Sequence, residues 1–177
     1  MRSAAWLGAA LLFAALLGGC ATPAGKQAMS PPDVNTGGKQ HPRSVQVSAS
    51  GGAETGALDS SNIGNADLRA AIETAITRSK LFKEVVQVGN GDYELAVTVI
   101  QLSKPLFGGT FTVDLEAGWS LVRTSDKTAV WRQVIKTSGT ATMSDAFVGV
   151  ERLRLAVEAA ARNNIQQGLG AIAGLQI

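Results

Sequence analysis

Three stretches in the middle of the chain alternate between apolar and polar residues. The clearest is 111–121, in which every second residue is apolar, and residues 93–102 follow a similar pattern. Residues 129–142 alternate again after the turn sequence Thr-Ser-Asp-Lys at 124–127. Alternation with a period of two is typical of strands that bury one face. We therefore expect three strands here, with the last two paired antiparallel through the turn.

Helical periodicity dominates two other parts of the chain. Residues 66–79 carry apolar side chains three or four positions apart, and a longer apolar stripe runs through 147–172. Weaker alternation at 44–50 and an apolar run at 81–88 predict two further strands. The order is then β-α-β-β-β-β-α. We expect an α+β fold, with a mainly antiparallel sheet of four to five strands and two helices packed on one of its faces.

The first twenty residues have a different character. Arg2 precedes an apolar run, Ala4 to Leu17, which is too short to span a bilayer because a spanning helix needs about 20 residues. A charged start, a short apolar run and small residues after it are typical of a secretory signal. The sequence LGGC, ending at Cys20, resembles a bacterial lipobox. The resemblance implies that residues 1–19 are removed and that Cys20, the only cysteine, carries the lipid.

The residues that follow predict a tether. Ala21 stands where an Asp would favour retention in the inner membrane, so the lipobox resemblance points to the outer membrane. Residues 20–43 are rich in Pro, Gly, Ala and polar residues without an apolar period, which predicts a disordered, lipidated linker. A flexible linker of this length would reach about 25–30 Å. We expect the folded periplasmic domain to comprise 44–177, with His41 inside the linker.

The chain offers few residues for catalysis. Nucleophile–base pairs usually need a histidine, and zinc sites need clusters of His or Cys. The only histidine is His41 and the only cysteine is Cys20, so we expect no catalytic residue, metal or cofactor. Asp114 and Glu116 share one strand face and form the only candidate carboxylate pair; a solvated strand face is the preferred interpretation. A formal net charge of +2 predicts no nucleic-acid surface.

Two features are candidates for contact with a partner. Leu106 and Phe107 lie in the loop sequence KPLFGG, either as an exposed apolar knuckle that binds a protein or folded back onto the core. Arg152, Arg154 and Arg162 lie on the last predicted helix. They would either meet an acidic partner or form an ordinary solvated helix surface.

Several segments together resemble a known group of proteins. They are SKLFKEV, DYELAVTV, AGWSLV, AVWRQ and ERLRLAVEAAARNNIQQGL. With the lipobox, they resemble small envelope lipoproteins of the YajG type. More loosely, they resemble the α/β domain of the TolB N-terminal part, the LpoB activator, CsgG and the auxiliary lipoproteins of ABC-type lipid transporters. The resemblance covers about residues 62–170 and implies a fold; it brings no catalytic residue with it.

The sequence therefore predicts a lipoprotein anchored in the outer membrane and facing the periplasm. We expect a non-enzymatic accessory subunit that binds an envelope protein in lipid transport or peptidoglycan synthesis. Its oligomeric state is left open. The alternative is binding of a lipid or glycan in a groove between helix and sheet, which would be weakened if Leu68, Ile72, Val97 and Leu153 filled that groove. An envelope hydrolase or transferase is the third hypothesis, and the residue inventory argues against it.

Overall fold

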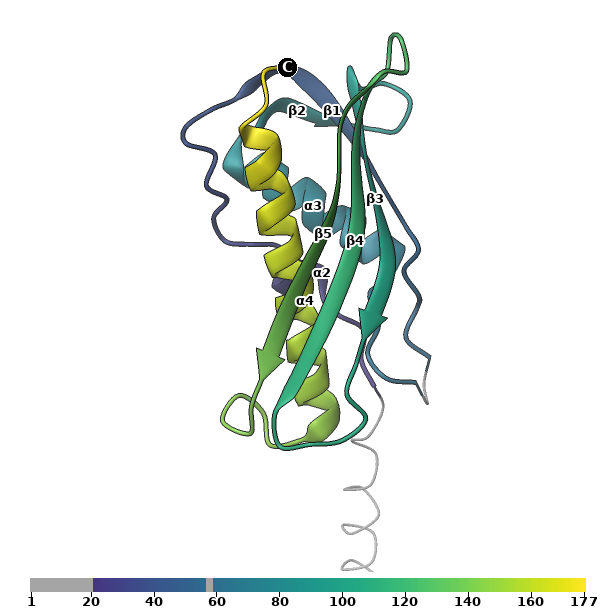
Figure 1. The fold of residues 1–177 in the computed structure, drawn as a ribbon, viewed down its shortest axis with the longest axis vertical. Coiled ribbons are helices and arrows are strands. Elements are labelled where there is room, and N and C mark those ends of the chain that lie inside the picture. The colour runs from purple at the N-terminus through teal and green to yellow at the C-terminus, as the bar shows by residue number, and fades with distance from the viewer. Residues whose placement is uncertain (1–20, 57–58) are drawn as a thin grey trace, which may run out of the picture.

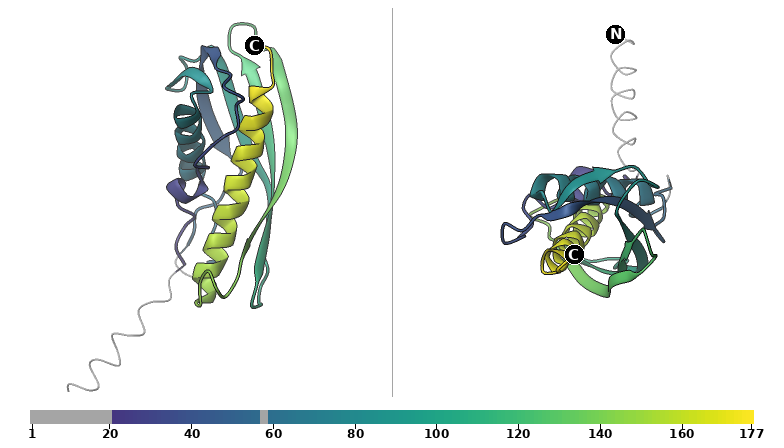
Figure 2. Two further views of the ribbon diagram at one scale, coloured as in Figure 1. Left: turned by 90° about the vertical axis from the view of Figure 1, so that its left-hand side faces the viewer. Right: turned by 90° about the horizontal axis from the view of Figure 1, so that it is seen from above.

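The computed structural model describes residues 21–56 and 59–177, which form a five-stranded sheet with helices on one face (Figure 1). The elements in chain order are α2 (Lys26–Met29), β1 (His41–Ser50), α3 (Asn65–Ser79), β2 (Phe82–Val86), β3 (Tyr93–Ser103), β4 (Phe111–Arg123), β5 (Ala129–Ala141) and α4 (Gly149–Ala173). The predicted α+β class is confirmed, and the two predicted helices correspond to α3 and α4. The molecule is elongated, and α4 runs along most of its length (Figure 2).

The strands lie in the order β2-β1-β3-β4-β5. Strand β1 is parallel to both of its neighbours, whereas β3, β4 and β5 form an antiparallel meander. Pairing of Phe111 with Ala141 and of Leu121 with Trp131 confirms the predicted antiparallel pairing of the last two strands. A parallel neighbour needs a crossover connection, and α3 lies in the connection from β1 to β2.

The alternation in β4 determines which face of the sheet is buried. Every second residue from Phe111 to Leu121 is at most 7% exposed, and these side chains pack beneath the helices. The polar residues between them lie on the opposite, solvent-facing side. This division is what a strand with one buried face requires, and it leaves the outer face of β4 mainly polar.

At Gly139, helix α4 approaches β5 so closely that no side chain fits between them. A Cβ atom added at Gly139 would lie 2.2 Å from the backbone nitrogen of Ala160. Asn164, buried in the interface, accepts a hydrogen bond from Trp119 Nε1 (2.8 Å) and donates one to the carbonyl oxygen of Ile135 (3.0 Å). Asn163 donates in the same way to Ser138 (2.9 Å). Helix α4 thus satisfies carbonyl groups of an edge strand that would otherwise face water.

The structure differs from the predicted linker at residues 20–43. The part that it describes before β1, which we call the N-terminal strap (residues 21–40), packs against the folded domain; Ala24 and Met29 in it are completely buried. Strand β1 begins at His41, whose ring Nε2 lies 3.1 Å from the carbonyl oxygen of Ile172. The sequence pattern does not indicate these few buried apolar residues, because they follow no regular period within a segment rich in Pro and Gly. The predicted signal and Cys20 lie outside the described residues.

Candidate functional site

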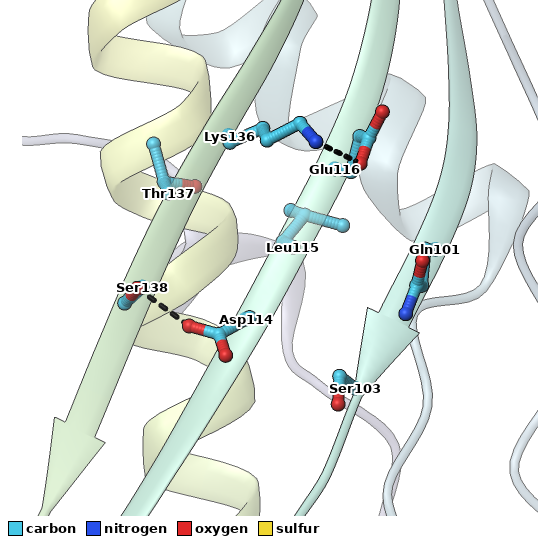
Figure 3. Close-up of a pocket in the computed structure, with 8 residues that line it drawn as sticks. All are labelled: Gln101, Ser103, Asp114, Leu115, Glu116, Lys136, Thr137 and Ser138. Carbon is cyan, nitrogen blue, oxygen red and sulfur yellow. Dashed lines mark hydrogen bonds and ion pairs between the residues drawn. The ribbon is translucent and has the colours of Figure 1, made fainter.

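The outer face of the sheet holds the only carboxylate pair that the sequence offered for acid–base chemistry. A shallow depression of about 400 Å³ lies over β3, β4 and β5 there, and Asp114 and Glu116 line it (Figure 3). Asp114 Oδ1 accepts a hydrogen bond from Ser138 Oγ (2.6 Å), and Glu116 Oε2 pairs with Lys136 Nζ (2.9 Å). Each carboxylate therefore has its own partner on the neighbouring strand.

This arrangement is that of cross-strand pairs on a solvated sheet face. The Lys136 side chain is 74% exposed, and exposed ion pairs contribute at most about 1 kcal/mol. In Figure 3 the two carboxylates point to different partners and do not converge on a shared point. The geometry supports strand pairing and register, and it gives Asp114 and Glu116 no common reacting position.

The described residues also bear on metals and on membrane spans. Within 21–56 and 59–177, no three or more His, Cys, Asp or Glu side chains gather in a way that could hold a metal ion. Among the helices of the same residues, none combines the length and the apolar character needed to cross a bilayer.

Arg152 is buried and bonds within the chain, which differs from both sequence interpretations, contact with an acidic partner and a solvated helix surface. Its guanidinium donates hydrogen bonds to the carbonyl oxygens of Ala146 (2.8 Å), Phe147 (3.1 Å) and Gly108 (3.1 Å). Its Cζ atom lies 4.8 Å from the centre of the Phe111 ring. Arg152 thus ties the loop before β4 to the loop before α4, with a cation–π contact beneath it.

Arg154 and Arg162 are partly buried, and both bond within the chain. Arg154 forms ion pairs with Glu151 and Glu158 on the same helix, and its hydrogen bond lowers the pKa of Glu151. Glu158, only 2% exposed, also accepts a hydrogen bond from the backbone N–H of Gly25 (2.9 Å). Arg162 donates to the carbonyl oxygen of Ala28 (2.9 Å). Glu158 and Arg162 thus hold the strap on α4.

Leu106 and Phe107 are exposed, as one of the two alternatives for this loop required. They are 93% and 87% exposed, and they lie in the loop between β3 and β4. Three further exposed apolar residues, Met143, Phe147 and Val148, lie in the loop between β5 and α4. Pairing of Phe111 with Ala141 brings these two loops together. We call these five residues the apolar end of the molecule.

The sequence indicated only two of the five residues of the apolar end. Met143, Phe147 and Val148 were not singled out, because the sequence pattern placed the last two at the start of a helix. The available signal was the short run of apolar residues after the turn that ends β5, which shows no helical stripe of its own. Only the strand register shows that this run lies beside Leu106 and Phe107.

The start of the strap lies at the same end of the molecule. Lys104, two positions before Leu106, donates to Ser60 Oγ (2.6 Å), Asn62 Oδ1 (2.6 Å) and the Ser61 carbonyl oxygen (3.2 Å). Ser61 Oγ in turn donates to the carbonyl oxygen of Thr22 (2.8 Å). Burial lowers the pKa of Lys104. A short hydrogen-bonded chain therefore joins the loop of the apolar end to the second residue after Cys20.

The helix–sheet interface is filled by side chains. Leu68 and Ile72 of α3, Val97 of β3 and Leu153 of α4 are all at most 8% exposed and belong to one continuous core. An added Cβ at Gly168 would lie 2.7 Å from the Trp119 ring, so α4 and β4 are in tight contact as well. The groove that the small-ligand hypothesis requires is therefore closed at these positions.

Comparison with solved structures identifies the fold. A Xanthomonas campestris protein of the family DUF330 superposes with a TM-score of 0.57 and 18% identity, covering 82% of this chain and 89% of that one. A variant of the PelC dodecamer from Paraburkholderia phytofirmans gives 0.51 and 15% identity, covering 83% and 95%. A candidate lipoprotein from Caulobacter crescentus gives 0.50 and 16% identity, covering 73% and 87%.

No protein-family model matches the sequence, and the comparison with curated proteins finds no match. The identities to the solved structures are low, so the likeness is one of fold. The chain shares its α+β fold with these bacterial proteins.

Proposed function

We propose that the chain is an outer-membrane lipoprotein, attached through lipid on Cys20, that serves as a non-enzymatic binding subunit of an envelope assembly. The lipobox at Leu17 to Cys20 and the resemblance to YajG-type and transport-auxiliary lipoproteins support this proposal. So does the shared fold with a candidate lipoprotein of Caulobacter crescentus. Lipid transport and peptidoglycan synthesis are the two processes in which we expect such a subunit.

The observation that carries the proposal is the packed N-terminal strap. Thr22 is hydrogen-bonded to Ser61, and Gly25 to Glu158. Two residues of extended chain span at most about 7 Å, so lipid on Cys20 would hold the domain directly against the membrane. A domain held this way has one fixed end and presents the rest of its surface to the periplasm. That arrangement suits a binding subunit with a fixed position better than a subunit that moves on a long flexible linker.

The outer face of the sheet is the surface we expect a protein partner to use. Ile100 and Val134 are 54% and 52% exposed there, on either side of Gly118. The ion pair between Glu116 and Lys136 lies beside this apolar strip, which gives it an apolar centre with a charged rim, as in an interface. PelC, which shares the fold, assembles as a dodecamer, so a second copy of this chain is one partner to test for.

The test is photo-crosslinking in cells followed by purification of the tethered protein from solubilised membranes. A photo-reactive residue in place of Val134 should yield a discrete crosslinked species, whose mass separates a second copy from another protein. The same residue in place of Val88, which is 61% exposed at the turn before β3, is the control. Equal labelling at both positions, or none at Val134, would reject this surface. The double substitution Asp114→Asn and Glu116→Gln should leave cells unchanged, because neither carboxylate is given a catalytic role.

A further inference from the structure

The apolar end is the largest gathering of exposed apolar side chains that the described residues contain. Leu106, Phe107 and Phe147 are each more than 80% exposed, and Met143 and Val148 are more than half exposed. Single exposed apolar residues are normal on protein surfaces, but a contiguous group of them marks a contact surface.

The loops that carry this surface are held in place from inside. Arg152 binds the carbonyl oxygens of Gly108, Ala146 and Phe147, one from the first loop and two from the second. Asp145 Oδ2 accepts hydrogen bonds from the backbone N–H (2.7 Å) and the hydroxyl (2.8 Å) of Thr142. These contacts hold the loop backbones in place in the free protein. The apolar end is therefore a preformed surface, which lowers the cost of binding.

The location of Thr22, near the start of the described residues, indicates which surroundings the apolar end faces. Thr22 lies at the apolar end through the chain of hydrogen bonds from Ser61 to Lys104. Figure 1 shows the loops before β4 and before α4 at this end of the molecule and the C-terminus at the other. Helix α4, with 25 residues, separates the two ends by about 37 Å at 1.5 Å per residue.

We propose that the apolar end inserts into the interface of the same bilayer that holds the lipid on Cys20. This inference rests on the proposed function for the lipid itself. The lipid and the apolar end then form two attachments to one membrane, which fixes the tilt of the domain as well as its distance. Aromatic and aliphatic tips are suited to the headgroup–acyl boundary. The positive charge of Arg152 does not oppose this, because backbone carbonyls and the Phe111 ring surround it.

The orientation has a direct consequence for the remaining surface. With the apolar end in the membrane, Val88 and the turn between β4 and β5 lie at the far end of the domain. Strand β3 separates Val88 from Lys104, and its eleven residues extend about 36 Å at 3.3 Å per residue. The outer face of the sheet then stands upright in the periplasm, accessible along its length.

The experiment measures contact with acyl chains directly, using the full-length protein purified from cells and reconstituted at low density. The vesicles contain phosphatidylethanolamine and phosphatidylglycerol, with or without bromine on the acyl chains. Leu106→Cys, Phe147→Cys and the control Val88→Cys each carry an environment-sensitive fluorophore. All three positions are exposed, so the substitutions leave the core intact. The unsubstituted protein is labelled in parallel; its single cysteine should not react, because a lipid-bearing thioether has no free thiol.

The expected result is a blue shift and a loss of fluorescence with brominated lipid at positions 106 and 147, and neither change at position 88. Anchored protein in which positions 106 and 147 stay unquenched would overturn the inference and leave the proposed function standing. A crosslink from position 106 to a protein in cells, with no quenching, would assign the apolar end to that protein instead. Quenching at position 88 as well would overturn the fixed orientation. Labelling of the unsubstituted protein would reject the lipid on Cys20, and with it the proposed function.

Discussion

The carboxylate of Glu158, buried on α4, accepts a hydrogen bond from the backbone N–H of Gly25 at 2.9 Å. The two residues are 133 positions apart, and the contact ties the first described part of the chain to its last helix. Arg154 pairs with the same carboxylate, and Arg162 holds the carbonyl oxygen of Ala28. The N-terminal strap is therefore part of the folded domain, and its position determines where a lipid on Cys20 would hold the molecule.

Replacing Glu158 should loosen the strap. Glu158→Ala removes the acceptor for the Gly25 N–H and one partner of Arg154, and we expect a loss of about 1–3 kcal/mol in the free energy of unfolding. Hydrogen exchange at the Gly25 amide should accelerate as well. Glu151→Ala is the control, because the Glu151 side chain is 44% exposed and should cost at most about 1 kcal/mol. Equal losses for the two variants would contradict the account of the strap.

Two glycines of α4 should respond to alanine with opposite signs. An added Cβ at Gly168 would lie 2.7 Å from the Trp119 ring, whereas one at Gly170 would meet nothing within 4 Å. We expect Gly168→Ala to destabilise the domain by about 1–3 kcal/mol through overpacking. Gly170→Ala should stabilise it by about 0.5–1 kcal/mol, because alanine favours a helix interior. Denaturant unfolding measures both, and a stabilising Gly168→Ala would show that α4 and β4 are not in close contact.

Asn164 should be far more important for stability than its neighbour Asn163. Asn164→Ala leaves Trp119 Nε1 and the Ile135 carbonyl oxygen buried without their partner, and each unsatisfied group costs about 1–3 kcal/mol. The hydrogen bond from Asn163 to Ser138 is exposed, so Asn163→Ala should change stability by at most about 0.5 kcal/mol. The midpoint of thermal unfolding distinguishes the two variants. Similar midpoints would mean that water replaces Asn164 at the interface.

The stability contributed by Asp92 should disappear in acid. The backbone N–H and the hydroxyl of Ser44 donate to Asp92 Oδ2, both at 2.9 Å, and the backbone bond is the main cause of the lowered pKa of Asp92. A carboxyl group whose pKa is lowered by folding stabilises the protein above its ordinary pKa of about 4. That contribution is lost as the pH falls through the lower pKa of the folded state.

Unfolding free energies measured across the acid range test this linkage. Asp92→Asn should be less stable than the original protein at neutral pH, and the two curves should converge as the pH falls. Ser44→Ala removes the hydroxyl donor and keeps the backbone donor, so it should lose only part of the same pH dependence. A constant difference between the Asp92→Asn and original curves at every pH would show that the charge of Asp92 contributes nothing.

The antiparallel half of the sheet could be predicted because its pairing is local. Alternation from Phe111 to Leu121 identifies the buried face, and a short turn joins β4 to β5. The insertion of β1 between β2 and β3 follows no such rule, because both of its partners are distant in sequence. Ser44 and Gln46 of β1 are also buried, satisfied by Asp92 and by the backbone N–H groups of Gly89 and Gly91. These buried polar residues weaken the alternation that would mark a strand.

Within the candidate site, the sequence correctly indicated only those residues whose role depends on exposure to solvent. Leu106 and Phe107 are exposed, as one interpretation of their loop required. Arg152 was misassigned because an arginine on a helix usually faces water, whereas here three loop carbonyls and an aromatic ring receive it. The strap was misassigned because Ala24 and Met29 are isolated apolar residues in a polar segment. The strap binds α4, which is far away along the chain. Two of the groups around Arg152, Gly108 and the Phe111 ring, are also distant in sequence.

The central claim is that this domain is held against a membrane by lipid on Cys20, and the intact mass of the protein purified from native envelopes tests it most directly. The account predicts a mature chain that begins at Cys20 and is heavier than its amino-acid sequence by the mass of attached fatty-acyl groups. A chain that still begins at Met1, or one that begins elsewhere and carries no acyl group, would contradict it.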